Sequence, residues 1–293
     1  MRKASLSRRL FLIFDASLMI LLMVACLYPL LYVLFASLSD SDKLLANTGL
    51  LLKPIGFNLS AYSAVAKNHM IYDGYKNTLF ILIVGVSINI FMTSLAAYFL
   101  SRRKHIMFKN FIMGMMLFTM FFNGGMIPTY ITVKNLGLYN SLFALILPGA
   151  INTYNLIIMR TSFMSIPQSL EEAAYLDGAR HISVLINVVI PLSKAIMAVM
   201  VLYYGVALWN SWFPASIYLN DRSKYPLQLI LREILLQNDV SNMAQGQGAA
   251  ESYSIGESIK YAVVIVATVP ILCVYPFLQK YFVKGVMIGA VKG

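Results

Sequence analysis

The segment 165–191 carries two adjacent carboxylates and a starting pattern typical of a short helix. Pro167 suits a first helical turn, and Ser169 with Glu172 three residues later predicts a capping box. Glu171 and Glu172 would lie at the positive end of the helix dipole. The chain shows neither a nucleophile–base pair nor an H-E-x-x-H metal motif, as a membrane hydrolase would need.

The rest of this segment predicts a bend and a second helix. Ala173 and Ala174 continue the first helix and keep one of its faces small, and Gly178 is a typical helix stop. The apolar pattern of 182–189 then leads to Pro191, which predicts a break before the next element. The pattern alone leaves two interpretations open: a helix that inserts into a partner's groove, or an amphipathic helix that rests on a membrane surface.

Several kinds of chemistry lack the residues they need. The sequence has no G-x-x-x-x-G-K-[ST] loop, so we expect that it does not hydrolyse ATP. A proton- or sodium-coupled carrier keeps ionisable residues inside its spans, whereas the apolar blocks here contain little besides Asp15 near one end. The net charge of +11 comes with no aromatic–basic face or nucleic-acid motif, so no nucleic acid is expected. These absences favour a passive gated pathway that another chain drives.

The elements that must position segment 165–191 are membrane helices. Hydrophobic residues make up 59% of the 293 residues and charged residues only 12%, and the apolar residues lie in long blocks, as in a membrane protein. A helix needs about 20 mostly apolar residues to cross the hydrocarbon layer. Six blocks fit an all-α polytopic membrane protein: 10–36, 78–100, 108–122 extended toward residue 131, 142–158, 195–219 and 259–282.

The distribution of basic residues predicts the orientation. If both termini are cytoplasmic, the inner segments hold 14 of the 23 Lys and Arg residues but only four of the 12 acidic residues. Because positive charge accumulates on the cytoplasmic side, both termini and segment 165–191 are expected in the cytoplasm of a multi-pass inner-membrane protein.

Segment 165–191 resembles the EAA loop of the permease subunits of binding-protein-dependent ABC importers. Glu172-Ala173-Ala174, three residues, Gly178, nine residues and then 188–191 match the pattern E-A-A-x3-G-x9-I-x-L-P, with two mild apolar exchanges. The resemblance implies a type I importer fold in which this loop forms a coupling helix that docks in a cleft of the ATPase subunit. It assigns ATPase coupling to Glu172, Ala173, Ala174, Asp177, Gly178 and Pro191.

The resemblance continues along the chain. The residues 209–214 look like the W-N-x-x-x-P segment of the carbohydrate-uptake branch, and 77–79 also fit. The tail resembles that of the maltose importer's shorter permease, which reaches between the two ATPase subunits. It implies contact with the ATPase at four positions, Lys284, Gly285, Gly289 and Lys292.

The resemblance also implies the partners and the organisation. A first part, 1–77, would hold the first span and an outer segment, and 78–293 would be the permease core with the coupling loop 165–191 and the tail 283–293. We expect a second similar permease, two ATPase subunits that bind ATP and Mg²⁺, an extracytoplasmic sugar-binding protein and membrane lipid as partners. No cofactor or metal is expected in this chain.

The resemblance implies ATP-driven import of oligosaccharides. The chain also resembles the subgroup of permeases that includes the alginate importer, which extends the expectation to acidic oligosaccharides such as alginate oligomers. Import of another solute, such as glycerol phosphate or a polyamine, and a non-transporting membrane scaffold stay open as alternatives. Polar and aromatic groups in the spans suit contact with a sugar, although such groups also bond between helices. These candidates for the substrate pathway are Asn89, Asn152, Asn155, Tyr203, Tyr204, Trp209 and Asn210.

Overall fold

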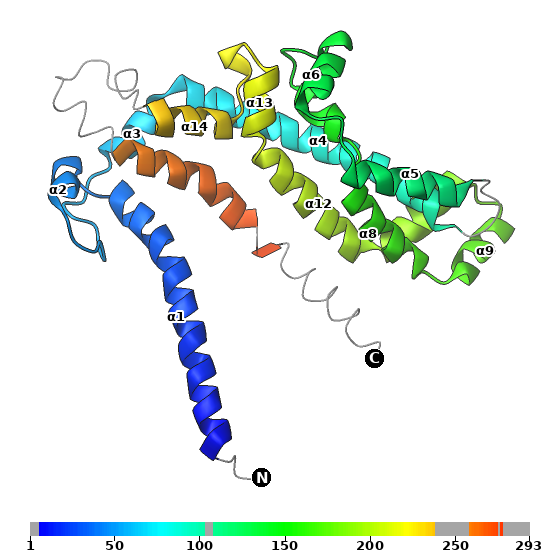
Figure 1. Ribbon diagram of the computed structural model, residues 1–293, viewed down its shortest axis with the longest axis horizontal. Helices are drawn as coiled ribbons and strands as arrows, with labels where there is room; N and C mark the ends of the chain where they lie inside the picture. The colour runs from blue at the N-terminus through cyan, green and yellow to red at the C-terminus, as the bar shows by residue number, and fades with distance from the viewer. Residues whose placement is uncertain (1–5, 103–107, 238–257, 275, 278–293) are drawn as a thin grey trace. The chain divides into compact units, whose positions relative to one another are not determined.

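The computed structural model describes residues 6–102, 108–237, 258–274 and 276–277, and in these ranges every named element is helical (Figure 1). An all-α fold is therefore confirmed. The α-helices are α1 Leu6–Ser37, α2 Ser41–Ala46, α3 Ser60–Lys67, α4 His69–Ser101, α5 Lys109–Phe121, α6 Met126–Asn135, α7 Phe143–Ile146, α8 Thr153–Met164, α9 Gln168–Leu176, α10 His181–Val184, α11 Ile190–Leu192, α12 Lys194–Trp209, α13 Trp212–Tyr218 and α14 Leu227–Gln237. Shorter pieces are 3₁₀ turns at Leu147–Gly149 and Arg222–Lys224, and a π-helix at Leu185–Val189; an apolar helix over Ser258–Val274 follows.

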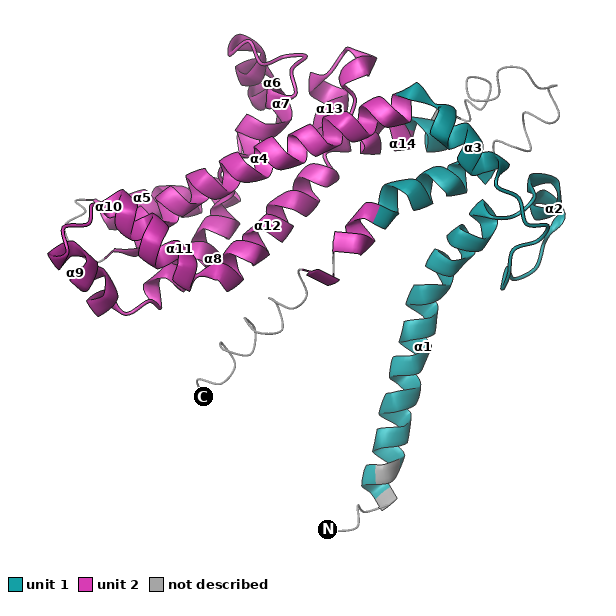
Figure 2. Cartoon of the chain, turned by 180° about the vertical axis from the view of Figure 1, so that it is seen from behind, with its two compact units in different colours: residues 1–69, 233–269 teal, residues 70–232, 270–293 magenta. Residues whose placement is uncertain are grey.

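Two compact units divide the chain, 1–69 with 233–269 and 70–232 with 270–293 (Figure 2). In the first unit, the end of α1, the helix α2 and the loop after it form a small apolar cluster of Ala36, Leu44 and Leu51. Tyr32 and Tyr261 meet edge to face beside this cluster, with ring centroids 6.0 Å apart. Most side chains of α1 between residues 10 and 27 are exposed and apolar, which is what a lipid-facing helix needs.

The structure has unbroken helices at two of the predicted spans and bent helix pairs at or next to three others. Leu10–Ser37 and His69–Ser101 are each long and apolar enough to cross a membrane alone. The third and fourth predicted spans each contain a bend, because α5 and α6 meet at 113° and Phe143–Gly149 and α8 at 53°. The third bent pair, His181–Leu192 and α12 at 89°, bends just before the predicted span 195–219. Counting each bent pair as one span gives five, and Ser258–Val274 covers the start of the predicted sixth.

The third span does not continue toward residue 131 as predicted. The chain turns after α5 because Gly125 has a φ of +89°, and the Asn123 side chain accepts a 2.6 Å hydrogen bond from the Gly125 N–H. Only glycine adopts such a φ without strain, so residues 126–135 form a separate helix, α6.

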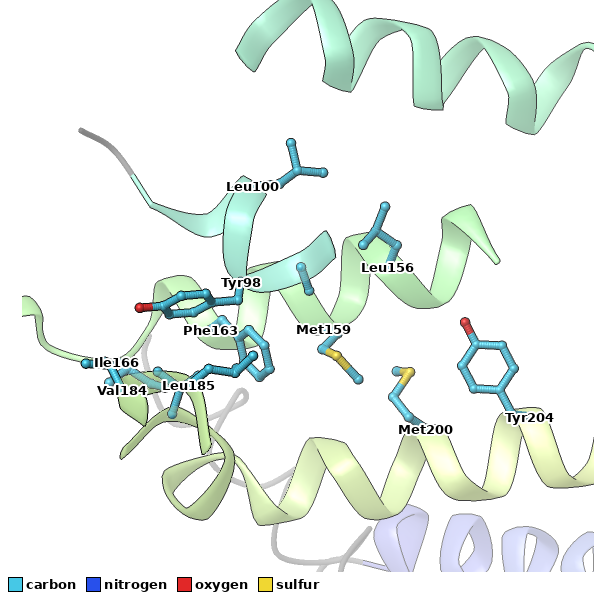
Figure 3. Close-up of a cluster of buried hydrophobic side chains, with 12 residues drawn as sticks. Tyr98, Leu100, Leu156, Met159, Phe163, Ile166, Val184, Leu185, Met200 and Tyr204 are labelled. Carbon is cyan, nitrogen blue, oxygen red and sulfur yellow. The ribbon is translucent and has the colours of Figure 1, made fainter. Parts of the chain in front are cut away.

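The core of the second unit lies where α4, α8 and α12 pack together (Figure 3). Phe163, Met159 and Leu156 of α8 and Met200 of α12 are fully buried there. Two methionines fill this core because their unbranched side chains adapt to irregular gaps. The same cluster extends to the segment after α9 through buried apolar side chains, so the coupling-loop region rests on the core.

Candidate functional site: the loop between α8 and α12

The helix α9 begins differently from the prediction. Pro167 occupies the position before its first residue, Gln168, and no side chain caps the N-terminus. Ser169 therefore lies inside the first turn, where its own backbone is helical and its side chain cannot cap the helix. The predicted capping box of Ser169 and Glu172 is not formed.

The helix α9 ends at the predicted glycine. Gly178 has a φ of +81°, and its N–H donates to the Tyr175 carbonyl at 3.0 Å. The Ala179 N–H donates to the Ala174 carbonyl at 2.9 Å. This pair of bonds is a Schellman motif, which satisfies two carbonyls that the end of a helix would otherwise leave unpaired. The prediction that Gly178 stops the helix is confirmed.

The two faces of α9 differ in what they contact. Glu172, Ala173 and Asp177 are exposed, and Leu176 on the same side is 90% exposed. Ala174 is partly buried against the core cluster. The residues predicted to couple to an ATPase thus lie on both an open surface (Glu172, Ala173, Asp177 and Gly178) and the inner side (Ala174).

The other glutamate of the pair, Glu171, points inward and is 4% exposed. Its carboxylate lies 2.6 Å from the guanidinium of Arg102, the residue that follows α4. That guanidinium also lies over the Tyr98 ring, 4.5 Å from its centroid, and its NH1 is 3.5 Å from the Phe163 carbonyl oxygen. Burial raises the pKa of the Glu171 carboxyl, and the neighbouring guanidinium opposes that rise.

A second polar link runs beside this ion pair. The hydroxyls of Tyr98 and Tyr175 are 2.9 Å apart, and the Tyr175 hydroxyl lies 2.7 Å from Nδ1 of His181. The chain of groups joins α4, α9 and α10. Sequence reasoning missed both links. The available signal was the spacing of Glu171, Ala174 and Tyr175, which places the three residues on one helical face.

The connection from α10 to α12 contains the predicted break. The π-helix Leu185–Val189 leads into α11, and the Ile190 N–H bonds to the Leu185 carbonyl, five residues back. Pro191 has no N–H to donate to the carbonyl four residues before it, so a regular α-helical ring cannot close there. The axis then turns at Ser193, giving the 89° bend before α12.

The candidate pathway residues fall into two groups. Asn89, Asn155, Tyr204 and Trp209 are buried, whereas the other three are at least partly open: Asn152, Tyr203 and Asn210. The structure brings Tyr204 and Asn152 together, because the Tyr204 hydroxyl accepts from the Asn152 N–H at 3.1 Å.

The same hydroxyl lies 2.7 Å from Oγ1 of Thr93, so Tyr204 links α4, α8 and α12. Asn152 also caps α8, since its side chain accepts a bond from the Asn155 N–H at 3.1 Å. The hydroxyl of Tyr204 is therefore engaged between helices. Two buried polar atoms of the candidate set have no hydrogen-bond partner in the described part of the chain, namely Oδ1 of Asn89 and Nε1 of Trp209.

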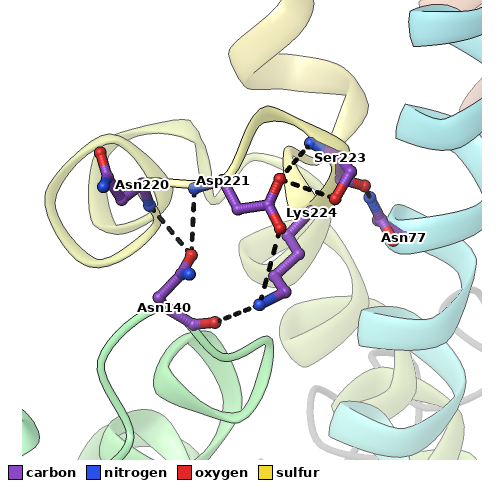
Figure 4. A network of polar contacts seen from close by, with 6 residues as sticks. All are labelled: Asn77, Asn140, Asn220, Asp221, Ser223 and Lys224. Carbon is purple, nitrogen blue, oxygen red and sulfur yellow. Dashed lines mark hydrogen bonds and ion pairs between the residues drawn. The ribbon is translucent and has the colours of Figure 1, made fainter.

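At the opposite end of α4, a polar network ties two loops to the helix (Figure 4). The Asn140 side chain accepts from the N–H groups of Asn220 and Asp221, both at 3.1 Å. The side chain of Asn77 donates to the Ser223 carbonyl at 2.8 Å, so this residue of the 77–79 segment joins α4 to the loop that contains Ser223. Hydrogen bonds from Ser223 hold the pKa of Asp221 below its usual value.

The predicted tail contacts lie outside the described residues: Lys284, Gly285, Gly289 and Lys292.

Comparison with known proteins gives a consistent result. A family model described as "Binding-protein-dependent transport system inner membrane component" matches residues 80–288. A polygalacturonan/rhamnogalacturonan transport system permease protein of Bacillus subtilis is 39% identical, over 98% of this chain and all of that protein. A trehalose/maltose transport system permease protein of Thermococcus litoralis is 26% identical over 98% of both chains.

Among solved structures, a chain of a bacterial ABC transporter involved in the import of the acidic polysaccharide alginate is similar to this one. It superposes with a TM-score of 0.87 and 30% identity, over 96% of this chain and 100% of that chain.

Proposed function

The chain belongs to the family of inner membrane components of binding-protein-dependent transport systems, and from this premise we propose that it is the permease subunit of an ATP-driven oligosaccharide importer. The observation that carries the proposal is the open face of α9, where Glu172 and Asp177 are exposed on a helix whose other face is held by the core. A short, rigid helix that presents small and acidic residues suits a groove on a partner. ATP binding and hydrolysis then take place in that partner, because this chain has no phosphate-binding loop.

The assembly that follows has a second permease of the same kind, two ATPase subunits and an extracytoplasmic binding protein. Both termini and α9 lie in the cytoplasm, in keeping with the excess of basic residues on that side. When the ATPase subunits close, α9 moves with them and the spans open toward the binding protein. The tail from Lys284 onward provides a second contact with the ATPase pair.

Docking is tested with Glu172→Lys, which reverses one charge on the open face of α9. We expect the variant to insert into the membrane but to lose co-purification with the ATPase subunits. Full retention of the ATPase subunits by this variant would contradict docking through α9.

For the substrate, we propose an acidic oligosaccharide. Two of the similar proteins are named for polygalacturonan/rhamnogalacturonan and for alginate, and polygalacturonan and alginate are chains of uronic acids. A uronate unit combines a carboxylate with an apolar sugar face. In this chain the guanidinium of Arg232 lies 4.2 Å from the centroid of the Trp212 ring, and its side chain is exposed. Within the described residues Arg232 has no ion-pair partner, so its charge is available to a carboxylate.

The test is the ATPase activity of the reconstituted complex with its binding protein, measured with oligouronides and with neutral maltodextrins. We expect stimulation by oligouronides, and an apparent affinity for them about 5-fold weaker in Arg232→Gln, as loss of about 1 kcal/mol implies. Lys134→Gln is the control, because Lys134 is exposed on α6 and makes no such ring contact.

Each other outcome selects an alternative. Stimulation by neutral sugars alone would keep the carbohydrate importer and discard the acidic substrate. A complex that assembles but responds to neither sugar would favour another solute, such as glycerol phosphate or a polyamine. Failure to bind ATPase subunits at all would favour a non-transporting scaffold.

A further inference from the structure

We propose that the Arg102–Glu171 ion pair, supported by the Tyr98–Tyr175–His181 chain, is the positioning link that makes α9 move together with the end of α4. The inference rests on the proposed function, since it concerns how motion of α9 reaches the spans. It gives adjacent glutamates separate tasks: Glu172 meets the ATPase subunit, and Glu171 passes the displacement on to α4.

The contacts of α9 with the rest of the unit favour polar attachment. Ala174 of α9 and Ala179, just after it, are partly buried and pack against the core cluster. The side chain of each is a single methyl group. Methyl groups bury little area and hold a helix weakly. The ion pair is different, because the side chain of Glu171 is 5% exposed and that of Arg102 is 18% exposed.

The position of Arg102 makes the link specific to α4. The residue follows Ser101, the last residue of a helix long enough to span the membrane alone. Arg102 is itself held on both sides, by the Tyr98 ring at 4.5 Å and by the Phe163 carbonyl. A displacement of Glu171 would therefore also disturb the contacts of this guanidinium with Tyr98 and Phe163.

The parallel chain of hydroxyls fixes the rotation of α9. Tyr175 lies one helical turn after Glu171 and its hydroxyl is 2.9 Å from that of Tyr98, so one face of α9 meets both α4 and the residue that follows it. On its other side, the Tyr175 hydroxyl lies 2.7 Å from Nδ1 of His181. Two points of contact transmit a tilt as well as a translation, which one flexible contact would not.

The experiment compares Glu171→Gln with Glu172→Gln in the complete complex in proteoliposomes. Three quantities are measured per assembled complex: retained ATPase subunits, ATP hydrolysis, and saccharide transported per ATP. We expect Glu171→Gln and Arg102→Gln to keep the ATPase subunits and hydrolysis but to lower transport per ATP by about 5-fold or more, the low end of coupling between distant sites. Glu172→Gln should weaken retention instead.

Two further variants separate a link from a general loss of stability. The double variant Arg102→Gln/Glu171→Gln should lose no more coupling than either single variant, because partners in one interaction are not additive. Tyr175→Phe keeps the ring but removes the hydroxyl, so it should lower transport per ATP in the same direction by a smaller factor. If Glu171→Gln fails to insert into the membrane, Tyr175→Phe replaces it as the test of the link.

The result that overturns the inference is wild-type transport per ATP in Glu171→Gln or, where that variant does not insert, in Tyr175→Phe. Additive losses in the double variant would also overturn it, as would loss of ATPase retention in Glu171→Gln equal to that in Glu172→Gln. If the wild-type complex itself transports no saccharide, the proposed function fails instead.

Discussion

Replacement of Gly178 should weaken ATPase docking through backbone conformation alone. Its φ is +81°, and a Cβ added there would meet no atom within 4 Å, so packing contributes nothing to the effect. A left-handed conformation costs an ordinary residue about 1–2 kcal/mol. If that strain opens the Schellman motif, the ratio of docking-competent to opened α9 falls by about 5- to 30-fold, and the apparent affinity for the ATPase subunit falls by up to the same factor.

The assay titrates ATPase subunits onto the permease pair in lipid nanodiscs. Gly178→Ala should show the full loss, whereas Gly178→Asn should show a smaller one, because asparagine tolerates the left-handed region. Gly114→Ala is the control: Gly114 also has open space around it but lies inside α5 with no positive φ, so affinity should not change. Equal affinities for wild type and Gly178→Ala would refute the reasoning, as would an Asn variant weaker than the Ala variant.

Three more perturbations test the spans and the network at the far end of α4. Tyr204→Phe should lower the stability of the detergent-solubilised permease by about 1 kcal/mol, as for hydrogen bonds between membrane helices, while Tyr203→Phe leaves its thermal unfolding unchanged. Gly85→Val should cost about 1–3 kcal/mol by the same measurement, because an added Cβ would lie 2.7 Å from a leucine of α12; Gly205→Val, with open space, should cost less. The pKa of Asp221 is lowered in the folded protein, so the stabilisation by its carboxylate should be complete above about pH 4 and fade as the pH falls further. The difference in Tm between wild type and Asp221→Asn should therefore shrink at low pH. A difference that stays constant with pH would contradict this expectation.

The sequence predicted elements whose signals are local. The glycine stop of α9 follows from the need for a positive φ, and the long apolar blocks follow from the thickness of the bilayer. The start of α9 was predicted less accurately, because Ser169 has the right type and spacing for a cap but lies two residues after the actual N-cap position, Pro167. Only the actual backbone decides which residue is the last non-helical one.

The anchoring of α9 was beyond sequence reasoning for a different reason. Arg102 and Glu171 are 69 positions apart, and nothing local indicates that they meet. The neighbouring Glu172 belongs to a recognisable motif, whereas Glu171 differs from other glutamates only in its burial, which the sequence does not show. The bends within the third and fourth predicted spans were missed in the same way, since hydropathy measures how apolar a segment is and not whether its axis is straight; the 89° bend before α12, by contrast, lies next to the break predicted at Pro191.

The π-helix at Leu185–Val189 changes the direction in which the side chains on either side of it point around the helix axis. A π-turn holds one residue more than an α-turn, and each residue of an α-helix advances about 100° around the axis and about 1.5 Å along it. Because the π-turn takes up one surplus residue, the side chains of α10 point about 100° away from where an uninterrupted α-helix of the same sequence would place them relative to α11. The surplus residue thus sets which side chains of the loop, among them Val184, face the core and which stay open to a partner.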